Sequence, residues 1–170
     1  MSSPPLRLNN IVIPQANEVT YLGIHLDKRL TWRKHIECKR TQIKLKALNL
    51  NWLLNKKSKL KLEHKVLLYN AAIKPIWTYG AQLWGTASTS NIELLQRAQS
   101  KILRNITSAP WYVKNLNIHQ DLRIPFVKAE LASIKAKYEN KLRQHPNPLA
   151  NNLSNVVHSS RLRRTDLPSY

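Results

Sequence analysis

Apolar and polar residues alternate near the N-terminus of the chain. From Val19 to Leu26 the alternation is that of a half-buried β-strand, with Leu22, Ile24 and Leu26 on one face. A short apolar run at 11–13 precedes this segment, and together the two predict a β-hairpin joined by a polar turn. Because a two-stranded hairpin is only marginally stable alone, we expect it to pack against a helical layer or against a neighbour outside this chain.

Helical periodicity begins directly after this hairpin. Apolar residues recur at nearly helical spacing over residues 32–55, and Thr31 is placed as the N-cap, which predicts a long first helix. A second helix is predicted to begin at a Ser58 cap and to run until Pro75 breaks or kinks it.

Two more helices are predicted in the second half of the chain. Residues 91–106 carry an apolar stripe, and Ser90 with Glu93 three residues later has the spacing of a capping box. Pro125 is well placed as the first residue of a last helix, whereas the polar stretch from Pro146 onward predicts a frayed tail. The pattern therefore predicts a mainly α fold, a short N-terminal β-hairpin followed by a bundle of long helices.

The net charge of the chain indicates which kinds of partner it can bind. The chain has 170 residues with 28 Lys and Arg against 9 Asp and Glu, a formal net charge of +19. This length suits one ordinary domain or two small helical lobes. Since a globule of this charge repels itself unless polyanions surround it, nucleic acid is the leading candidate partner, ahead of an anionic membrane.

The single cysteine and the lack of long apolar runs indicate where in the cell the protein would be found. Cys38 is the sole cysteine, which excludes an internal disulfide and fits a reducing environment. The N-terminal segment lacks the apolar core of a signal peptide, and no apolar run is long enough to span a bilayer. We expect an intracellular protein of the nucleus or cytoplasm, with no membrane partner.

The cations are concentrated between residues 28 and 65, where Glu37 and Glu63 are the only acids. An ordinary solvated helix face usually interleaves acids for i,i+4 pairing, and they are nearly absent here, which favours contact with phosphates. The candidate nucleic-acid-binding residues are Lys28, Arg29, Arg33, Lys34, Lys39, Arg40, Lys44, Lys46, Lys56 and Lys57.

The tryptophans leave two interpretations open. Aromatic side chains can stack on bases, but helical spacing favours the core, and we predict core packing for Trp52 and Trp77. Trp111 stands in the loop "PWYV" beside Tyr112, where either a packed or a surface role is possible.

Candidate catalytic and metal-binding groups are sparse. His35 and Cys38 have the spacing of half a zinc site, but no second pair of ligands follows. Two-metal nucleotidyl transfer requires paired carboxylates, and no pair is visible. Asp27 is interpreted as structural, either capping the chain that enters the first helix or pairing with Arg29. No catalytic residue and no metal site is assigned.

Three stretches resemble a known family: "VTYLGIHLDKRLTWRKHI", "NAAIKPIWTYGAQLWGTASTSNIELLQRAQSKILRNITSAPWYV" and "IHQDLRIPFVKAEL". From about Val19 to Leu131 the chain is similar to the C-terminal part of the reverse transcriptase of non-LTR, LINE-type retrotransposons of the Jockey kind. In that family the polymerase has fingers, palm and thumb. The resemblance implies that Tyr21, Leu22 and Gly23 belong to a primer-grip-like hairpin and that the helices after it are thumb-like.

The resemblance also implies a division of the chain and the absence of other parts. Residues 1–27 correspond to the hairpin at the palm edge, 28–109 to a thumb-like bundle, 110–145 to a C-terminal loop and helix, and 146–170 to a flexible basic tail. The palm aspartates belong upstream, so we expect no cofactor in this chain, with Mg²⁺ needed only by the complete polymerase. Palm, fingers and endonuclease domains are missing, which suggests a truncated reading frame or a degenerate copy.

Three hypotheses follow. The first is a polymerase fragment that binds an RNA or DNA template–primer duplex through its backbone and is inactive as an enzyme alone. The second is a free-standing, non-enzymatic RNA- or DNA-binding helical protein derived from such an element. The third is a relic that does not fold stably.

Overall fold

Two β-hairpins precede a set of helices in the computed structural model, which describes residues 7–14 and 16–149. This confirms the prediction of a mainly α fold with an N-terminal hairpin. The strands are β1 (Arg7–Leu8), β2 (Ile11–Val12), β3 (Glu18–Tyr21) and β4 (Ile24–Asp27). The helices are α1 (Arg33–Asn49), α2 (Asn51–Leu54), α3 (Leu62–Leu68), the π turn η1 (Tyr69–Ile73), α4 (Lys74–Thr78), α5 (Ala81–Trp84), α6 (Thr89–Thr107), α7 (Asn115–Asp121) and α8 (Val127–Arg143).

The strand pairing differs from the predicted hairpin. The apolar run at 11–13 pairs with β1 rather than with the later segment, and β3 pairs with β4 in a hairpin of its own. The reason lies in two tight turns: Asn9 and Asn10 have φ of 49° and 62°, and Leu22 and Gly23 have φ of 47° and 74°. Positive φ at both central residues is what a two-residue type I′ hairpin turn requires. Residues 19–26 are therefore two strands and a turn.

The first helix ends earlier than predicted. α1 stops at Asn49, and the short α2 follows after Leu50. Leu54 is fully buried, as its position on the same helical face as the buried Ile43 requires, whereas Trp52 projects from the opposite face and is 70% exposed, so the prediction of a packed Trp52 is wrong. Trp77 is buried, as predicted.

Pro75 does not end the second helix. The helix begins at Leu62 rather than at a Ser58 cap, and it passes through η1, where the backbone N–H of Lys74 donates to the carbonyl of Tyr69, five residues earlier. Proline has no N–H and its ring crowds the carbonyl four residues before it. A widened turn directly before Pro75 relieves that crowding and lets the helix continue into α4.

The later helix caps also differ from the predicted ones. The N-cap of α6 is Ser88, whose hydroxyl accepts from the Asn91 N–H at 3.4 Å, so Ser90 lies inside the helix and the capping box is absent. Pro125 precedes α8, whose first N–H, on Val127, donates to the Gln96 side chain at 2.7 Å. A residue of α6 thus supplies the cap of α8.

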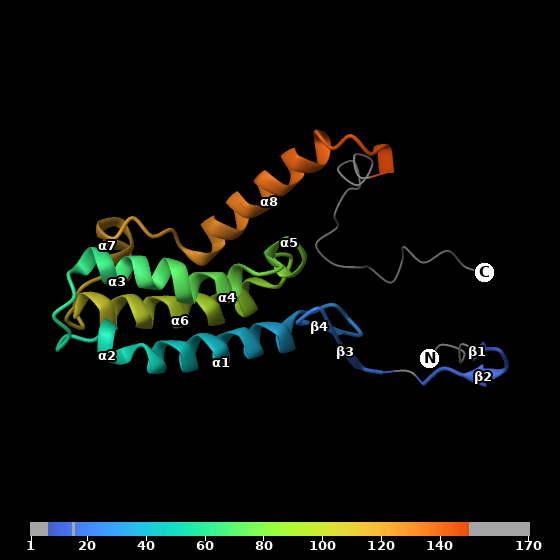
Figure 1. Cartoon of the computed structure of the whole chain (residues 1–170), viewed down its shortest axis with the longest axis horizontal. Helices are drawn as coiled ribbons and strands as arrows, with labels where there is room; N and C mark the ends of the chain where they lie inside the picture. The colour runs from blue at the N-terminus through green and yellow to red at the C-terminus, as the bar shows by residue number, and fades with distance from the viewer. Residues whose placement is uncertain (1–6, 15, 150–170) are drawn as a thin grey trace.

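The bundle is built around two parallel helices, α1 and α6, with α3, η1 and α4 running antiparallel to them (Figure 1). The α1–α6 pair is tied at both ends: Asn91 donates to the Thr31 carbonyl at 3.1 Å, and Asn105 donates to the Asn51 side chain at 3.0 Å. α5 packs on α8, and α7 packs on α6.

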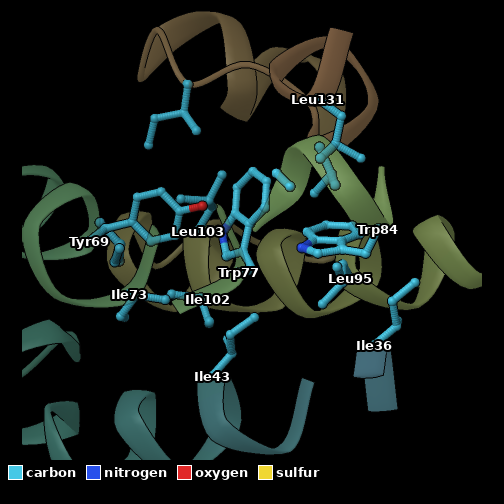
Figure 2. Close-up of a cluster of buried hydrophobic side chains, with 14 of the residues drawn as sticks. Ile36, Ile43, Tyr69, Ile73, Trp77, Trp84, Leu95, Ile102, Leu103 and Leu131 are labelled. Carbon is cyan, nitrogen blue, oxygen red and sulfur yellow. The ribbon is translucent and has the colours of Figure 1, made fainter. Parts of the chain in front are cut away.

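The core lies where these helices meet. Figure 2 shows Tyr69, Trp77 and Trp84 beside the leucines of α6, with Ile36 and Ile43 of α1 on one side of the rings and Leu131 of α8 on the other. Burying one large aromatic side chain removes roughly 150–250 Å² from water, so these three rings form much of the driving force for folding. One ion pair, between Lys74 and Glu130 at 2.8 Å, links α4 to α8.

Two sequence expectations concern membranes and the tail. Within the described ranges no helix is both long and apolar enough to cross a lipid bilayer. The predicted flexible basic tail at 146–170 falls almost wholly outside the described residues, which end at Leu149.

Candidate nucleic-acid interface

A groove of about 810 Å³ runs between α1 and α6. Its apolar lining includes the small residues Ala47 and Ala98, which leave space between the two helix backbones, and the larger Leu94 and Ile102. The two helices also pack on each other through buried residues such as Ile43 and Ile102, and two asparagine hydrogen bonds link them at their ends. The groove therefore lies on the outer side of a packed helix pair.

Four cations line this groove. Arg40 and Lys44 come from α1, one turn apart, and Arg97 and Lys101 come from α6 at the same spacing. All four are exposed, and none takes part in the ion pairs found among residues 7–14 and 16–149. In the part of the chain that the structure describes, no Asp or Glu lines the groove. Two facing rows of cations with no carboxylate in the described lining create a positive trough, which attracts a polyanion.

Sequence reasoning found one side of the groove and missed the other. Arg40 and Lys44 are among the predicted binding residues, whereas Arg97 and Lys101 are not. A signal was present, because Arg97, Lys101 and Arg104 recur at i, i+4 and i+7 on α6, away from its apolar stripe. The sequence does not reveal that α1 and α6 pair in parallel, and this pairing makes the two cationic rows face each other.

The other predicted cations lie at several places on the surface. Lys28 and Arg29 occupy the turn after β4, and Lys56 and Lys57 occupy the turn after α2, all four exposed. Arg33 is paired with Glu37 at 3.0 Å. Lys34 and Lys46 are exposed on α1 but are not part of the groove lining. The predicted single basic face is thus divided among separate surfaces.

Lys39 is buried, at 7% exposure, with its ammonium 5.2 Å from the centre of the Tyr79 ring. This is the geometry of a cation–π contact. Lys65, at the end of the basic stretch, is also buried and donates to the Asn55 carbonyl at 2.7 Å. Both lysines therefore serve internal contacts in this structure.

Tyr21, Leu22 and Gly23 come together at the tip of the β3–β4 hairpin. Tyr21 and Leu22 are 65% and 70% exposed. A leucine at positive φ costs on the order of 1 kcal/mol, and the Tyr79 hydroxyl holds this turn by donating to the Leu22 carbonyl at 2.8 Å. Gly23 is suited to the turn by its positive φ; a Cβ there would meet only Tyr79, at 3.9 Å.

Asp27 has the structural role predicted for it. Its carboxylate accepts from the backbone N–H groups of Arg29, Thr31 and Trp32 at 2.9–3.0 Å, and from the Thr31 hydroxyl at 3.0 Å. Partial burial by itself raises the pKa of Asp27, but these hydrogen bonds outweigh burial and hold the pKa below its usual value. The carboxylate fixes the chain as it enters α1.

His35 and Cys38 do not form part of a zinc site. His35 is buried and its Nδ1 accepts from the His25 N–H at 3.3 Å, while the Cys38 thiol contacts Gln42 at 3.6 Å. Among the described residues no three His, Cys, Asp or Glu side chains gather as a metal site. The described residues therefore do not offer a set of ligands that fits a Mg²⁺ ion.

The chain is similar over nearly its whole length to proteins of Drosophila mobile elements. It is 38% identical over 161 residues to a probable RNA-directed DNA polymerase from transposon X-element of Drosophila melanogaster, covering 95% of this chain and 18% of that protein. It is 36% identical over 160 residues to a probable RNA-directed DNA polymerase from transposon BS of the same species, covering 94% and 18%. An RNA-directed DNA polymerase from mobile element jockey of Drosophila funebris is 33% identical over 150 residues, covering 88% and 16%.

These matches confirm the resemblance to jockey-like polymerases. They also show that it covers only a small part of each relative. The chain spans less than a fifth of the length of the curated relatives it matches. No protein-family model and no solved structure matches the chain.

Proposed function

We propose that this chain, a relative of the RNA-directed DNA polymerases of jockey-like non-LTR retrotransposons, holds a nucleic-acid duplex by its phosphates in the α1–α6 groove. The observation that supports this most strongly is the pair of cationic rows, Arg40 with Lys44 and Arg97 with Lys101, facing across a groove whose described lining has no carboxylate. In the complete polymerase this segment would be thumb-like and would grip the template–primer duplex.

The physical basis is counterion release. Each cation placed near a phosphate frees a condensed counterion, so the affinity is high at low salt and falls steeply as salt rises. Phosphates carry no sequence information, so binding is expected to be nearly independent of sequence. Catalysis is assigned to parts of the polymerase outside this chain, where paired carboxylates would hold Mg²⁺.

The test is a charge-removal experiment on the full chain. A variant with Arg40→Gln, Lys44→Gln, Arg97→Gln and Lys101→Gln is titrated against a labelled RNA–DNA hybrid at several salt concentrations. We expect weaker binding and a shallower slope of log K against log salt, by about 0.9 for each phosphate that the variant no longer neutralises.

A matched control removes the same charge elsewhere. Lys128, Lys137, Lys141 and Arg143 of α8 are exposed and lie outside the groove, so their replacement by Gln lowers the net charge equally. The control should keep most of the affinity and slope. If both variants weaken binding by the same amount, binding follows net charge alone and the groove has no special role.

A further inference from the structure

The loop between α6 and α7 is held in place by one side chain. The Arg104 guanidinium donates to the Pro110 carbonyl at 3.0 Å, to the Val113 carbonyl, and to the Asn115 side chain at 2.8 Å. A guanidinium is a planar fork of donors, so three acceptors bound at once leave the loop little freedom. Arg104 therefore fixes both ends of the short segment that contains Trp111 and Tyr112.

That segment displays its two aromatic side chains to solvent. Trp111 is 90% exposed and Tyr112 69%, and their rings meet edge to face with centroids 5.9 Å apart. Large aromatic side chains usually bury most of their surface. Here the hydrogen bonds of Arg104 hold the backbone on both sides of an exposed tryptophan, which indicates a surface prepared for a partner.

The surroundings of this aromatic pair are cationic. Between Glu93 and Asp121 the sequence contains no acidic residue. Arg104 also lines a second hollow of about 310 Å³, on whose rim Arg97 and Lys101 lie as well. These two cations thus border both the α1–α6 groove and the hollow that leads toward the loop, a span of about 10 Å along α6.

We propose that Trp111 and Tyr112 form a stacking platform for the bases of an unpaired nucleic-acid strand, whose phosphates pass along Arg97 and Lys101. This proposal rests on the proposed function, because Arg97 and Lys101 would serve both the α1–α6 groove and the aromatic platform. It extends that function from duplex backbone to single-stranded bases, such as an overhanging template. Base–aromatic stacking tolerates any sequence because every base has a π face.

A protein partner is the competing occupant of an exposed aromatic surface. The charge near the platform favours nucleic acid, because Arg104 binds the loop itself, Lys114 follows it closely in the sequence, and Arg97 and Lys101 line the same hollow as Arg104. An unpaired strand provides both a phosphate for these cations and a flat base for the indole ring.

The test compares single-stranded with duplex binding by the full chain. Trp111→Ala is titrated by fluorescence anisotropy against a labelled oligothymidylate of about 12 nucleotides and against a hairpin duplex with the same number of phosphates. We expect affinity for the single strand to fall about 5- to 150-fold, the equivalent of ~1–3 kcal/mol for the removal of one stacked base, with little change for the duplex. The salt slope should stay unchanged because every phosphate keeps its cation.

Two further variants separate a held platform from mere exposure. Trp52→Ala is the matched control, because Trp52 is similarly exposed but lies on α2, and it should leave single-strand affinity unchanged. Arg104→Lys keeps the charge but removes the fork, so it should weaken single-strand binding without altering the salt slope. Circular dichroism establishes that each variant keeps its helices.

Several outcomes would overturn the platform. Unchanged single-strand affinity in Trp111→Ala would show that the aromatic pair takes no part in binding the strand, and an equal weakening on single strand and duplex would exclude base stacking. The same weakening in Trp52→Ala would show that any exposed tryptophan suffices. Duplex binding in the groove is tested separately, by titrating the charge-removal variant and its control against an RNA–DNA hybrid. Either proposal can therefore fail while the other stands.

Discussion

His35 is buried against Trp32, Trp84 and His25, and its environment makes protonation unfavourable. Because Nδ1 accepts from the His25 N–H, the ring proton resides on Nε2, which has no hydrogen-bond partner among the described residues. Burial, helped by the nearby charges of Lys39 and His25, lowers the pKa of His35 from 6.5 to about 4. A charged imidazolium in this position would lack both solvent and a counter-charge.

We predict that this histidine makes the fold sensitive to mild acid. In the unfolded chain His35 binds a proton near its ordinary pKa of 6.5, whereas in the folded chain it does so only near 4. Its contribution to stability is therefore complete above pH 6.5 and is lost as the pH falls from 6.5 to 4. The decrease in the free energy of unfolding is at most about 3 kcal/mol.

Urea unfolding between pH 4 and pH 7.5 measures this effect. His35→Gln should flatten the pH dependence over that interval, while the same change at the exposed His145 should leave it as in the parent chain. A parent curve that is flat between pH 4 and pH 6.5 would contradict the prediction.

Individual residues also show where sequence reasoning works. The structural role of Asp27 was predictable, because an aspartate directly before a helix has backbone N–H groups within reach. The exposure of Trp52 was predictable as well, because Trp52 lies about half a turn round the helix from Ile43 and the two cannot share a buried face. The left-handed turn at Leu22 was not predictable, because leucine rarely adopts positive φ.

At the scale of elements, the long helices were predictable and their ends were not. The stripe of Leu95, Ile102 and Ile106 identifies α6 unambiguously, yet the cap is Ser88 although Ser90 has the better capping-box pattern. Pairing is harder still, because it depends on tertiary contacts. The α1–α6 groove depends on the packing of two helices that are far apart in the sequence, with hydrogen bonds between residues sixty and fifty-four positions apart, which no local pattern reveals.

We predict unequal protection of the elements from hydrogen exchange. All four residues of β3 are exposed and β4 buries only Ile24 fully, whereas α6 buries six residues in the centre of the bundle. Amides of β3 and β4 should therefore exchange much faster than those of residues 95–106, because a local opening of the hairpin exposes little apolar surface.

Exchange followed by mass spectrometry or NMR on the full chain reads this directly. Equally slow exchange in both segments would show that the hairpin is as well supported as the core. That result would favour the free-standing nucleic-acid-binding protein over a polymerase fragment whose hairpin depends on a palm.

At the scale of the whole molecule, we predict that the chain alone does not extend a primer on an RNA template. Both oxygens of Asp27 are occupied by hydrogen bonds within its own loop, and among the described residues no three His, Cys, Asp or Glu side chains gather where they could hold metal ions. Two-metal transfer needs carboxylates free to bridge the ions.

Primer extension with Mg²⁺, compared with a buffer control, measures this. Extension that is abolished by Asp27→Asn would refute the structural interpretation of Asp27. Extension that survives this change would place the activity in a contaminant or in residues outside the described ranges.

The π turn η1 also bears on how the length of this chain compares with that of its relatives. Its hydrogen bond reaches back five residues rather than four, so the turn holds one residue more than an α-helical turn. In evolutionary terms it is equivalent to a single-residue insertion, which rotates Trp77 by about 100° relative to Val66 compared with an uninterrupted helix. A relative with an unbroken helix here would align with a one-residue gap between positions 69 and 73, and would keep the same apolar pattern on either side of it.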